Sequence, residues 1–198
     1  MTPLFKNSCY VEFFGLAGSG KTYLSESLNM SHHGEKPNRR ALMIHSLYYF
    51  PIIMILYLMI SRVGFNVIPK SRWRSSFMMF KKLITAHYVS SKGLLYYCDH
   101  GISQELLKIK KGRGRDRIVR FCYFILGEHS CRIKFVNIIA ENELILQRRL
   151  TRKDKHDNFR ISDLRNVLES GIFDESMFDL SNQLELVGFQ VELLKNNG

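Results

Sequence analysis

The sequence predicts an α/β protein, a three-layer α/β/α sandwich around a five-stranded parallel sheet. Three observations predict it: a glycine-rich loop follows the first apolar run, an acid ends the third run, and helical stretches separate the runs. Because parallel strands need long crossovers that are usually helices, this alternation favours a sheet covered on both faces. The expected strands are 9–14, 41–44, 93–99, 131–140 and 188–194, and the expected helices are 21–30, 77–90, 118–126, 141–153, 162–170 and 177–186.

Length and charge limit the choice of architecture and partner. The chain has 198 residues, which suits a single domain spanning 1–198. Its net charge is +11, and before Asp99 the only acids are Glu12, Glu26 and Glu35, against a dozen lysines and arginines. This excess predicts an anionic partner: nucleotide phosphates first, then a phosphorylated lipid, an anionic membrane surface or nucleic acid.

The first expected strand leads into a loop with the pattern G-x-x-x-x-G-K-T. Backbone N–H groups of such a loop surround a diphosphate at the N-terminus of the following helix. Lys21 is expected to reach the β- and γ-phosphates of ATP, and the Thr22 hydroxyl to coordinate Mg²⁺. A plain strand-to-helix turn explains the glycines but not the Lys-Thr pair. The predicted nucleotide-binding residues are Gly15, Leu16, Ala17, Gly18, Ser19, Gly20, Lys21 and Thr22.

Asp99 ends the third expected strand. Ligands of open parallel sheets bind at the carboxyl ends of the strands, so Asp99 is expected beside the phosphate loop. An ordinary helix N-cap is the alternative.

The loop sequence resembles that of the P-loop NTPase superfamily, and in form it is most similar to the nucleoside and nucleotide (thymidylate-like) kinases. The Asp99-His100-Gly101 triplet resembles the Asp-x-Gly element of these kinases, and 133–153 resembles their strand followed by a helix that ends in R-x-x-x-R. The resemblance implies that Asp99 serves either as a magnesium ligand, together with Thr22, or as the base that accepts the proton of an acceptor hydroxyl. It also implies that Arg148 and Arg152 steady the transferring phosphoryl group and that 148–160 contains a lid. A basic helix end that binds its own last carbonyls is the alternative.

The long stretch between Lys21 and Asp99 is an expected insertion, at about 45–90, where these kinases build the acceptor site. Residues 41–61 contain no Asp, Glu, Lys or Arg. The length of this uncharged stretch is close to that of a helix that crosses a bilayer. The stretch fits three structures: a core helix, a helix that lies on the bilayer or lines an apolar substrate pocket, and a helix that spans the bilayer. Spanning is disfavoured because it would put the strands of one site on opposite sides of a membrane. The basic stretch 69–76 around Trp73 is expected either to contact an anionic substrate or lipid head groups by charge, or to be an exposed basic loop with one packed aromatic.

The remaining features favour a cytoplasmic protein, with membrane-peripheral attachment as the open alternative. Four scattered cysteines form no C-x-x-C pair, and the N-terminus lacks the apolar core of a secretion signal. Residues 108–117 carry six basic side chains and two glycines, which predicts a flexible anion-binding loop. Nucleic acid is a disfavoured partner because no aromatic residue lies within this run to stack on bases.

These observations predict an ATP-dependent phosphotransferase that uses Mg²⁺, with Lys21, Asp99, Arg148 and Arg152 in catalysis. The expected acceptor is a small anionic molecule carrying a hydroxyl or phosphate, such as a nucleoside, nucleotide, sugar or lipid-linked sugar. No N-K-x-D motif specifies guanine, so ATP is preferred over GTP. The alternative is a membrane-peripheral nucleotide-binding regulatory or assembly protein with little phosphotransfer.

Overall fold

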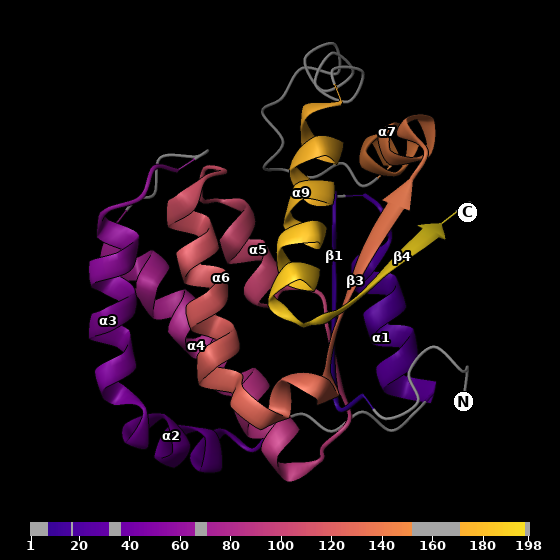
Figure 1. The fold of residues 1–198 in the computed structure, drawn as a ribbon. Coiled ribbons are helices and arrows are strands. Elements are labelled where there is room, and N and C mark those ends of the chain that lie inside the picture. The colour runs from indigo at the N-terminus through magenta and orange to yellow at the C-terminus, as the bar shows by residue number, and fades with distance from the viewer. Residues whose placement is uncertain (1–7, 17, 32–36, 66–70, 152–170, 197–198) are drawn as a thin grey trace.

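The fold was obtained as a computed structural model that describes residues 8–16, 18–31, 37–65, 71–151 and 171–196. Four strands and a set of helices alternate along these residues (Figure 1). In chain order the elements are β1 (Tyr10–Gly15), α1 (Lys21–Ser31), α2 (Arg39–Tyr48), α3 (Phe50–Ser61), α4 (Arg72–Lys92), β2 (Tyr96–Cys98), α5 (Ile102–Leu107), α6 (Arg113–Leu126), the 3-10 helix η2 (Gly127–Arg132), β3 (Ile133–Ala140), α7 (Asn142–Thr151), α9 (Ile172–Val187) and β4 (Gln190–Asn196).

The sheet is parallel throughout, with strand order β2-β1-β3-β4. Its interior strand β1 pairs Tyr10 with both Tyr96 of β2 and Ile133 of β3. Figure 1 shows α1 on one face of the sheet and α4, α5, α6 and α9 on the other. The carboxyl ends of β1 and β2 therefore lie side by side, which brings the phosphate loop and Asp99 to one edge.

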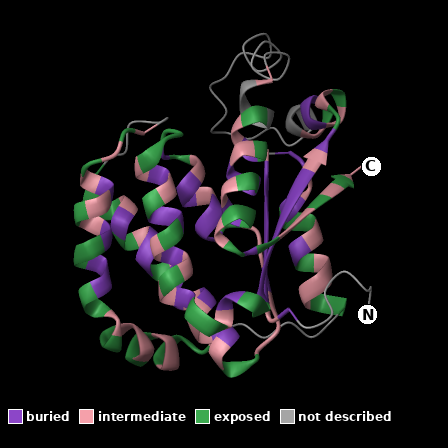
Figure 2. Ribbon diagram, viewed as in Figure 1, coloured by how far each residue is buried: buried purple, intermediate pink, exposed green. Residues whose placement is uncertain are grey.

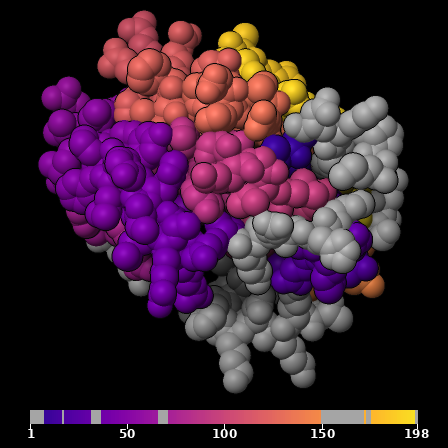
Figure 3. Space-filling view, turned by 90° about the horizontal axis from the view of Figure 1, so that it is seen from below, coloured from indigo at the N-terminus to yellow at the C-terminus, as the bar shows by residue number. Residues whose placement is uncertain are grey.

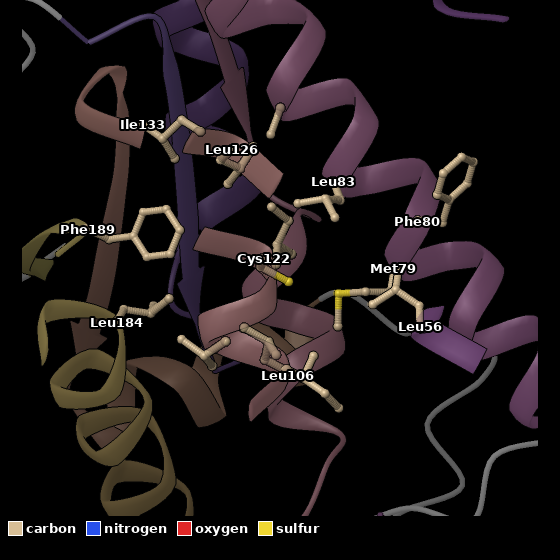
Figure 4. Packing of buried hydrophobic residues seen from close by; sticks show 14 of the residues in the cluster. Leu56, Met79, Phe80, Leu83, Leu106, Cys122, Leu126, Ile133, Leu184 and Phe189 are labelled. Carbon is tan, nitrogen blue, oxygen red and sulfur yellow. The ribbon is translucent and has the colours of Figure 1, made fainter. Parts of the chain in front are cut away.

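Alternating side chains of β1 build the two cores. Tyr10 and Phe14 enter the larger cluster, formed with α3, α4, α5, α6 and α9, whereas Val11 and Phe13 face Leu24 of α1. All six residues of β1 are buried, as expected of a parallel strand covered on both faces (Figure 2). Figure 4 shows the larger cluster, in which Phe189 and other side chains from segments far apart in the sequence interdigitate. The sheet edge that carries the site is thus fixed from both faces.

The prediction of five strands was wrong within the described residues, which contain four. Residues 41–44 were expected to form a strand but belong to α2. Their Ala-Leu-Met-Ile sequence starts with good helix formers, and the Asn38 side chain caps the helix by accepting a hydrogen bond of 2.9 Å from Arg40 N. The helix expected at 77–90 begins earlier, because α4 already starts at Arg72 behind the N-cap Ser71. The alternative of an exposed basic loop over 69–76 is therefore wrong from Arg72 on.

The run 108–117 is not a free anion-binding loop, because internal carboxylates neutralise part of it. Lys108 pairs with Glu105 at 2.7 Å, and Lys111 pairs with Asp179 of α9 at 2.9 Å. Arg115 lies in the first turn of α6, is completely buried, and forms an ion pair with the same Asp179. The composition of this run does not reveal a partner on α9, so the expectation failed on a contact distant in sequence.

The apolar segment 41–61 divides into two helices. No described helix is by itself long and apolar enough to cross a bilayer, and α2 and α3 pass that test only as a pair bent by 72°. Ile52, Ile53, Leu56 and Ile60 of α3 are buried against the rest of the larger cluster. One face of α3 is therefore buried in the core. This agrees with the alternative of a core helix.

A cluster of histidines joins α2 to α4 and η2. Nε2 of His45 lies 3.0 Å from Nδ1 of His87, and the Tyr49 hydroxyl lies 3.3 Å from Nε2 of His87. His129 packs edge-on against His87, and Tyr88 packs edge-on against His45. Burial, followed by the positive charge that His45 and His129 can carry, lowers the pKa of His87 to about 4. Burial and Lys92 also lower the pKa of His45.

His87 is expected to make the fold lose stability in mild acid. Its pKa is 6.5 when unfolded and about 4 when folded. The unfolded chain therefore binds more protons between these values, and stability falls as pH drops from 6.5 towards 4. His87 is only half-buried, so we expect a loss of about 1–2 kcal/mol, less than the full shift implies. Urea unfolding of His87→Gln should show a flatter pH dependence across this window, whereas the exposed control His100→Gln should retain the slope of the wild type.

Candidate nucleotide site

The phosphate loop joins β1 to α1 in a conformation that only glycine adopts readily. Gly15, Gly18 and Gly20 have φ of 151°, 97° and 96°. A Cβ on Gly15 would overlap the carbonyl oxygen of Ile138, because β1 and β3 run close together there. The structure describes every predicted loop residue except Ala17, which lies outside the described residues. Strand, loop and helix follow one another as the sequence predicted.

Two polar side chains in the loop are suited to phosphate. Lys21 is buried at the start of α1, and its Nζ donates a hydrogen bond of 2.8 Å to the Leu16 carbonyl, which folds the ammonium group over the loop. Ser19 is completely buried, and its Oγ has no hydrogen-bond partner among the described residues. A buried hydroxyl without a partner is unfavourable, and a phosphate oxygen would satisfy it. The loop therefore fits a nucleotide phosphate by its own chemistry.

Thr22 and Asp99 meet at the edge of the sheet, as predicted. Oγ1 of Thr22 donates a hydrogen bond of 2.6 Å to Oδ2 of Asp99, although the two residues are 77 positions apart. Asp99 directly follows β2, which pairs with β1. His100 Nε2 lies 3.6 Å from the same carboxylate oxygen. The described residues contain no group of three or more His, Cys, Asp or Glu that could hold a metal, but a hydroxyl and a carboxylate are oxygen ligands that suit Mg²⁺ once phosphate oxygens complete the shell.

Glu12 lies beneath the Asp99 turn, and no motif in the sequence marks it. It is fully buried in β1. Its carboxylate accepts hydrogen bonds of 2.7 Å from the backbone N–H groups of Ile102 and Ser103. The hydroxyl groups of Ser103 and Tyr10 also donate to it. Burial raises the pKa of Glu12, although the hydrogen bonds from Ser103 and Ile102 oppose that rise. The side chain ties the start of α5 to β1 and so positions the turn that carries Asp99.

Two further side chains close over the phosphate loop. Arg148 of α7 donates a hydrogen bond of 3.3 Å to the Gly18 carbonyl, which places its guanidinium at the loop as predicted. Asn196 at the end of β4 donates one of 2.7 Å to the Ser19 carbonyl. Sequence reasoning missed Asn196, because no motif marks it. Arg152 and most of the expected lid lie outside the described residues.

Comparison with known proteins gives distant structural similarities only. No family model and no curated protein matches the chain. Shikimate kinase from Acinetobacter baumannii, solved in complex with shikimate, is similar over 98% of this chain and 88% of its own, with 14% identity and a TM-score of 0.45. Deoxyadenosine kinase from M. mycoides, solved with bound dCTP, is similar over 94% and 89%, with 10% identity and a TM-score of 0.34. Independently of these proteins, the described residues form an α/β fold in which β1 lies between β2 and β3 of a parallel sheet, and a glycine-rich loop with the phosphate-binding pattern follows β1.

Proposed function

We propose that the protein is an ATP-dependent phosphotransferase that acts on a small anionic acceptor. The observation that carries the proposal is the convergence of Lys21, the Thr22–Asp99 pair and Arg148 on one phosphate loop. Phosphoryl transfer requires little covalent chemistry from the protein, so a site that positions phosphates and stabilises their charge is sufficient.

Each residue has a distinct part in this proposal. Lys21 and the loop N–H groups hold the β- and γ-phosphates, and Arg148 offsets the charge that spreads over the oxygens of the transferring group. Thr22 and Asp99 would hold Mg²⁺, which supplies further charge neutralisation when bound. Asp99 is also close enough to the loop to accept the acceptor's proton. Arg152 is proposed to assist Arg148, because both arginines belong to the R-x-x-x-R pattern in which residues 133–153 resemble nucleoside and nucleotide kinases.

The acceptor is proposed to bind beside the insertion formed by α2, α3 and α4. These helices occupy the connection between α1 and β2, the strand that Asp99 directly follows. The insertion contains no acidic residue from Arg39 to Cys98. An acceptor with a phosphate or carboxylate suits this charge better than a cationic one.

Transfer of the γ-phosphate from labelled ATP to a panel of nucleosides, nucleotides, sugars, small hydroxy acids and polysaccharide-lipid intermediates tests the proposal. We expect transfer to one acceptor class, dependent on Mg²⁺, and loss of transfer in Lys21→Ala. ATP binding without transfer to any acceptor would contradict the proposal and favour a regulatory nucleotide-binding protein.

Arg148→Ala is expected to slow transfer by about 10²- to 10³-fold while changing ATP affinity much less, because the arginine acts mainly on charge that develops during transfer. The exposed neighbour Gln147→Ala serves as the matched control in α7 and should retain most of the activity. Steady-state kinetics separates kcat from KM for both variants. A rise in KM for ATP with an unchanged kcat would show that Arg148 only binds nucleotide.

A further inference from the structure

A broad apolar surface covers the outside of α2, α3 and the start of α4. On α3 the outward face is apolar for its whole length, with Phe50, Met54, Ile55 and Leu58 exposed. The space-filling view shows α2 and α3 as one continuous region of the molecular face (Figure 3). Exposed large apolar residues of this surface, called here the α2–α3 face, are Met43, Ile44, Leu47, Tyr48, Phe50, Met54, Ile55, Leu58, Trp73 and Phe77.

Ring packing joins the parts of this surface on α3 and α4. The rings of Tyr57 and Trp73 are 5.6 Å apart, which joins the outer side of α3 to the first turn of α4. Phe77 follows Trp73 one helical turn later and is also exposed. Isolated exposed apolar residues need no explanation, but a contiguous patch of this kind marks an interaction site.

Positive charge flanks the α2–α3 face at both ends, and acidic charge is missing from its elements. Arg39 and Arg40 lie at the start of α2, and Arg62 and Arg72 lie where α3 ends and α4 begins. Residues 39–98 contain nine lysines and arginines and no aspartate or glutamate. An apolar centre with a basic border is the pattern of helices that lie in the interface of an anionic bilayer, where Tyr and Trp side chains also favour the head-group level.

A groove of about 220 Å³ lies beside the same surface, between α3 and α6. Ile55, Leu58, Met59 and Val63 form its apolar wall, and the exposed guanidinium groups of Arg62 and Arg117 lie in its lining. Neither arginine has an ion pair with another described residue. The apolar wall fits an acyl chain of an anionic phospholipid, and the two arginines fit its phosphate.

We infer that the α2–α3 face docks the protein on the surface of an anionic lipid bilayer, with α3 lying in the interface and Arg62 and Arg117 contacting lipid phosphates. The 72° bend between α2 and α3 is compatible with helices that lie on the bilayer, because neither alone is long enough to cross it. A symmetric dimer through this face would bring like charges together, since all the charged residues of α2, α3 and α4 are basic. The inference goes beyond the proposed phosphotransferase and does not depend on it.

Flotation of the purified full chain with lipid vesicles tests this docking. We expect binding to phosphatidylcholine vesicles that contain about one-third phosphatidylglycerol, and weak binding to phosphatidylcholine alone, because the basic border needs anionic lipid. Met54→Ser with Ile55→Ser and Leu58→Ser should weaken partitioning by about tenfold or more. These three side chains are half-exposed, so their loss spares the core, unlike substitution of the buried Ile52 or Ile60.

Matched controls keep the test specific to this surface. Phe124→Ser and Leu186→Ser remove exposed apolar side chains outside the α2–α3 face and should leave flotation unchanged. Arg62→Glu with Arg117→Glu should reduce binding to anionic vesicles and remove its salt dependence. Equal flotation with both vesicle types, or an equal loss of flotation in the controls, would overturn the inference. It would also be overturned if the protein did not float and instead formed a dimer that the triple serine variant dissociates. Circular dichroism at matched temperature confirms that every variant is folded.

Discussion

Lys21→Ala is expected to lower phosphoryl transfer by about 10³-fold or more, because the hydrogen bond to the Leu16 carbonyl holds the Lys21 ammonium group over the phosphate loop. The fold should be little affected. Lys21 makes a hydrogen bond to the Leu16 carbonyl within its own loop, and such a bond contributes about 1 kcal/mol. Activity and stability should therefore separate in this variant.

Thermal unfolding with and without ATP measures both effects in one experiment. Wild-type protein should gain stability as ATP is added, because a ligand that binds only the folded state raises the unfolding temperature. Lys21→Ala should unfold near the wild-type temperature without ATP and gain much less from it. Lys81→Ala, which removes an exposed lysine from α4, should behave as wild type. An ATP response retained in full by Lys21→Ala would contradict the assigned site.

Gly101→Ala is expected to destabilise the fold by about 3 kcal/mol or more, although it adds a single methyl group. A Cβ at Gly101 would overlap Oε2 and Cδ of Glu12 and lie 2.5 Å from the Tyr10 hydroxyl. Neither neighbour can move away freely. Glu12 is held by Ile102 and Ser103, and Tyr10 is buried in the sheet. The turn that carries Asp99 must shift instead, so nucleotide-dependent stabilisation should fall as well.

Chemical denaturation of Gly101→Ala against Gly64→Ala checks this expectation. The atoms nearest to a Cβ at Gly64 belong to the flexible Lys110 side chain, the first at 3.1 Å, so Gly64→Ala should change stability by less than about 1 kcal/mol. Similar midpoints for the two variants would show that the Glu12 carboxylate adjusts and that the tight approach at Gly101 is not needed.

Much of the site could be predicted because its chemistry is local in sequence. Lys21 and Thr22 follow the loop glycines at fixed spacing, and Asp99 ends an apolar run, so a parallel sheet brings them to the same edge. The 2.6 Å contact between Thr22 and Asp99 confirms their proximity. Arg148 was placed by resemblance in a helix after a strand, and the structure confirms that it reaches the loop.

The missed features depend on contacts between distant segments. Glu12 is one acid in an apolar strand, and only the fold shows that it binds the start of α5. Asn196 reaches the loop because β4 is parallel to β3 and ends beside it. Arg115 became a core residue because Asp179 and Gln183 of α9 face it. Helix propensity and a cap decided the structure of 41–44, where the apolar run alone suggested a strand.

The order of strands in the sheet sets when the nucleotide site can assemble during synthesis. β1 is synthesised before the other described strands but lies inside the sheet, so both of its edges can be paired only after Tyr96 and Ile133 have followed Tyr10. The loop then gains Arg148 and Asn196 later still. Such distant pairing slows folding and keeps unpaired strand edges exposed in partial chains. ATP affinity should therefore arise abruptly, after residue 196 has been released, rather than grow with chain length.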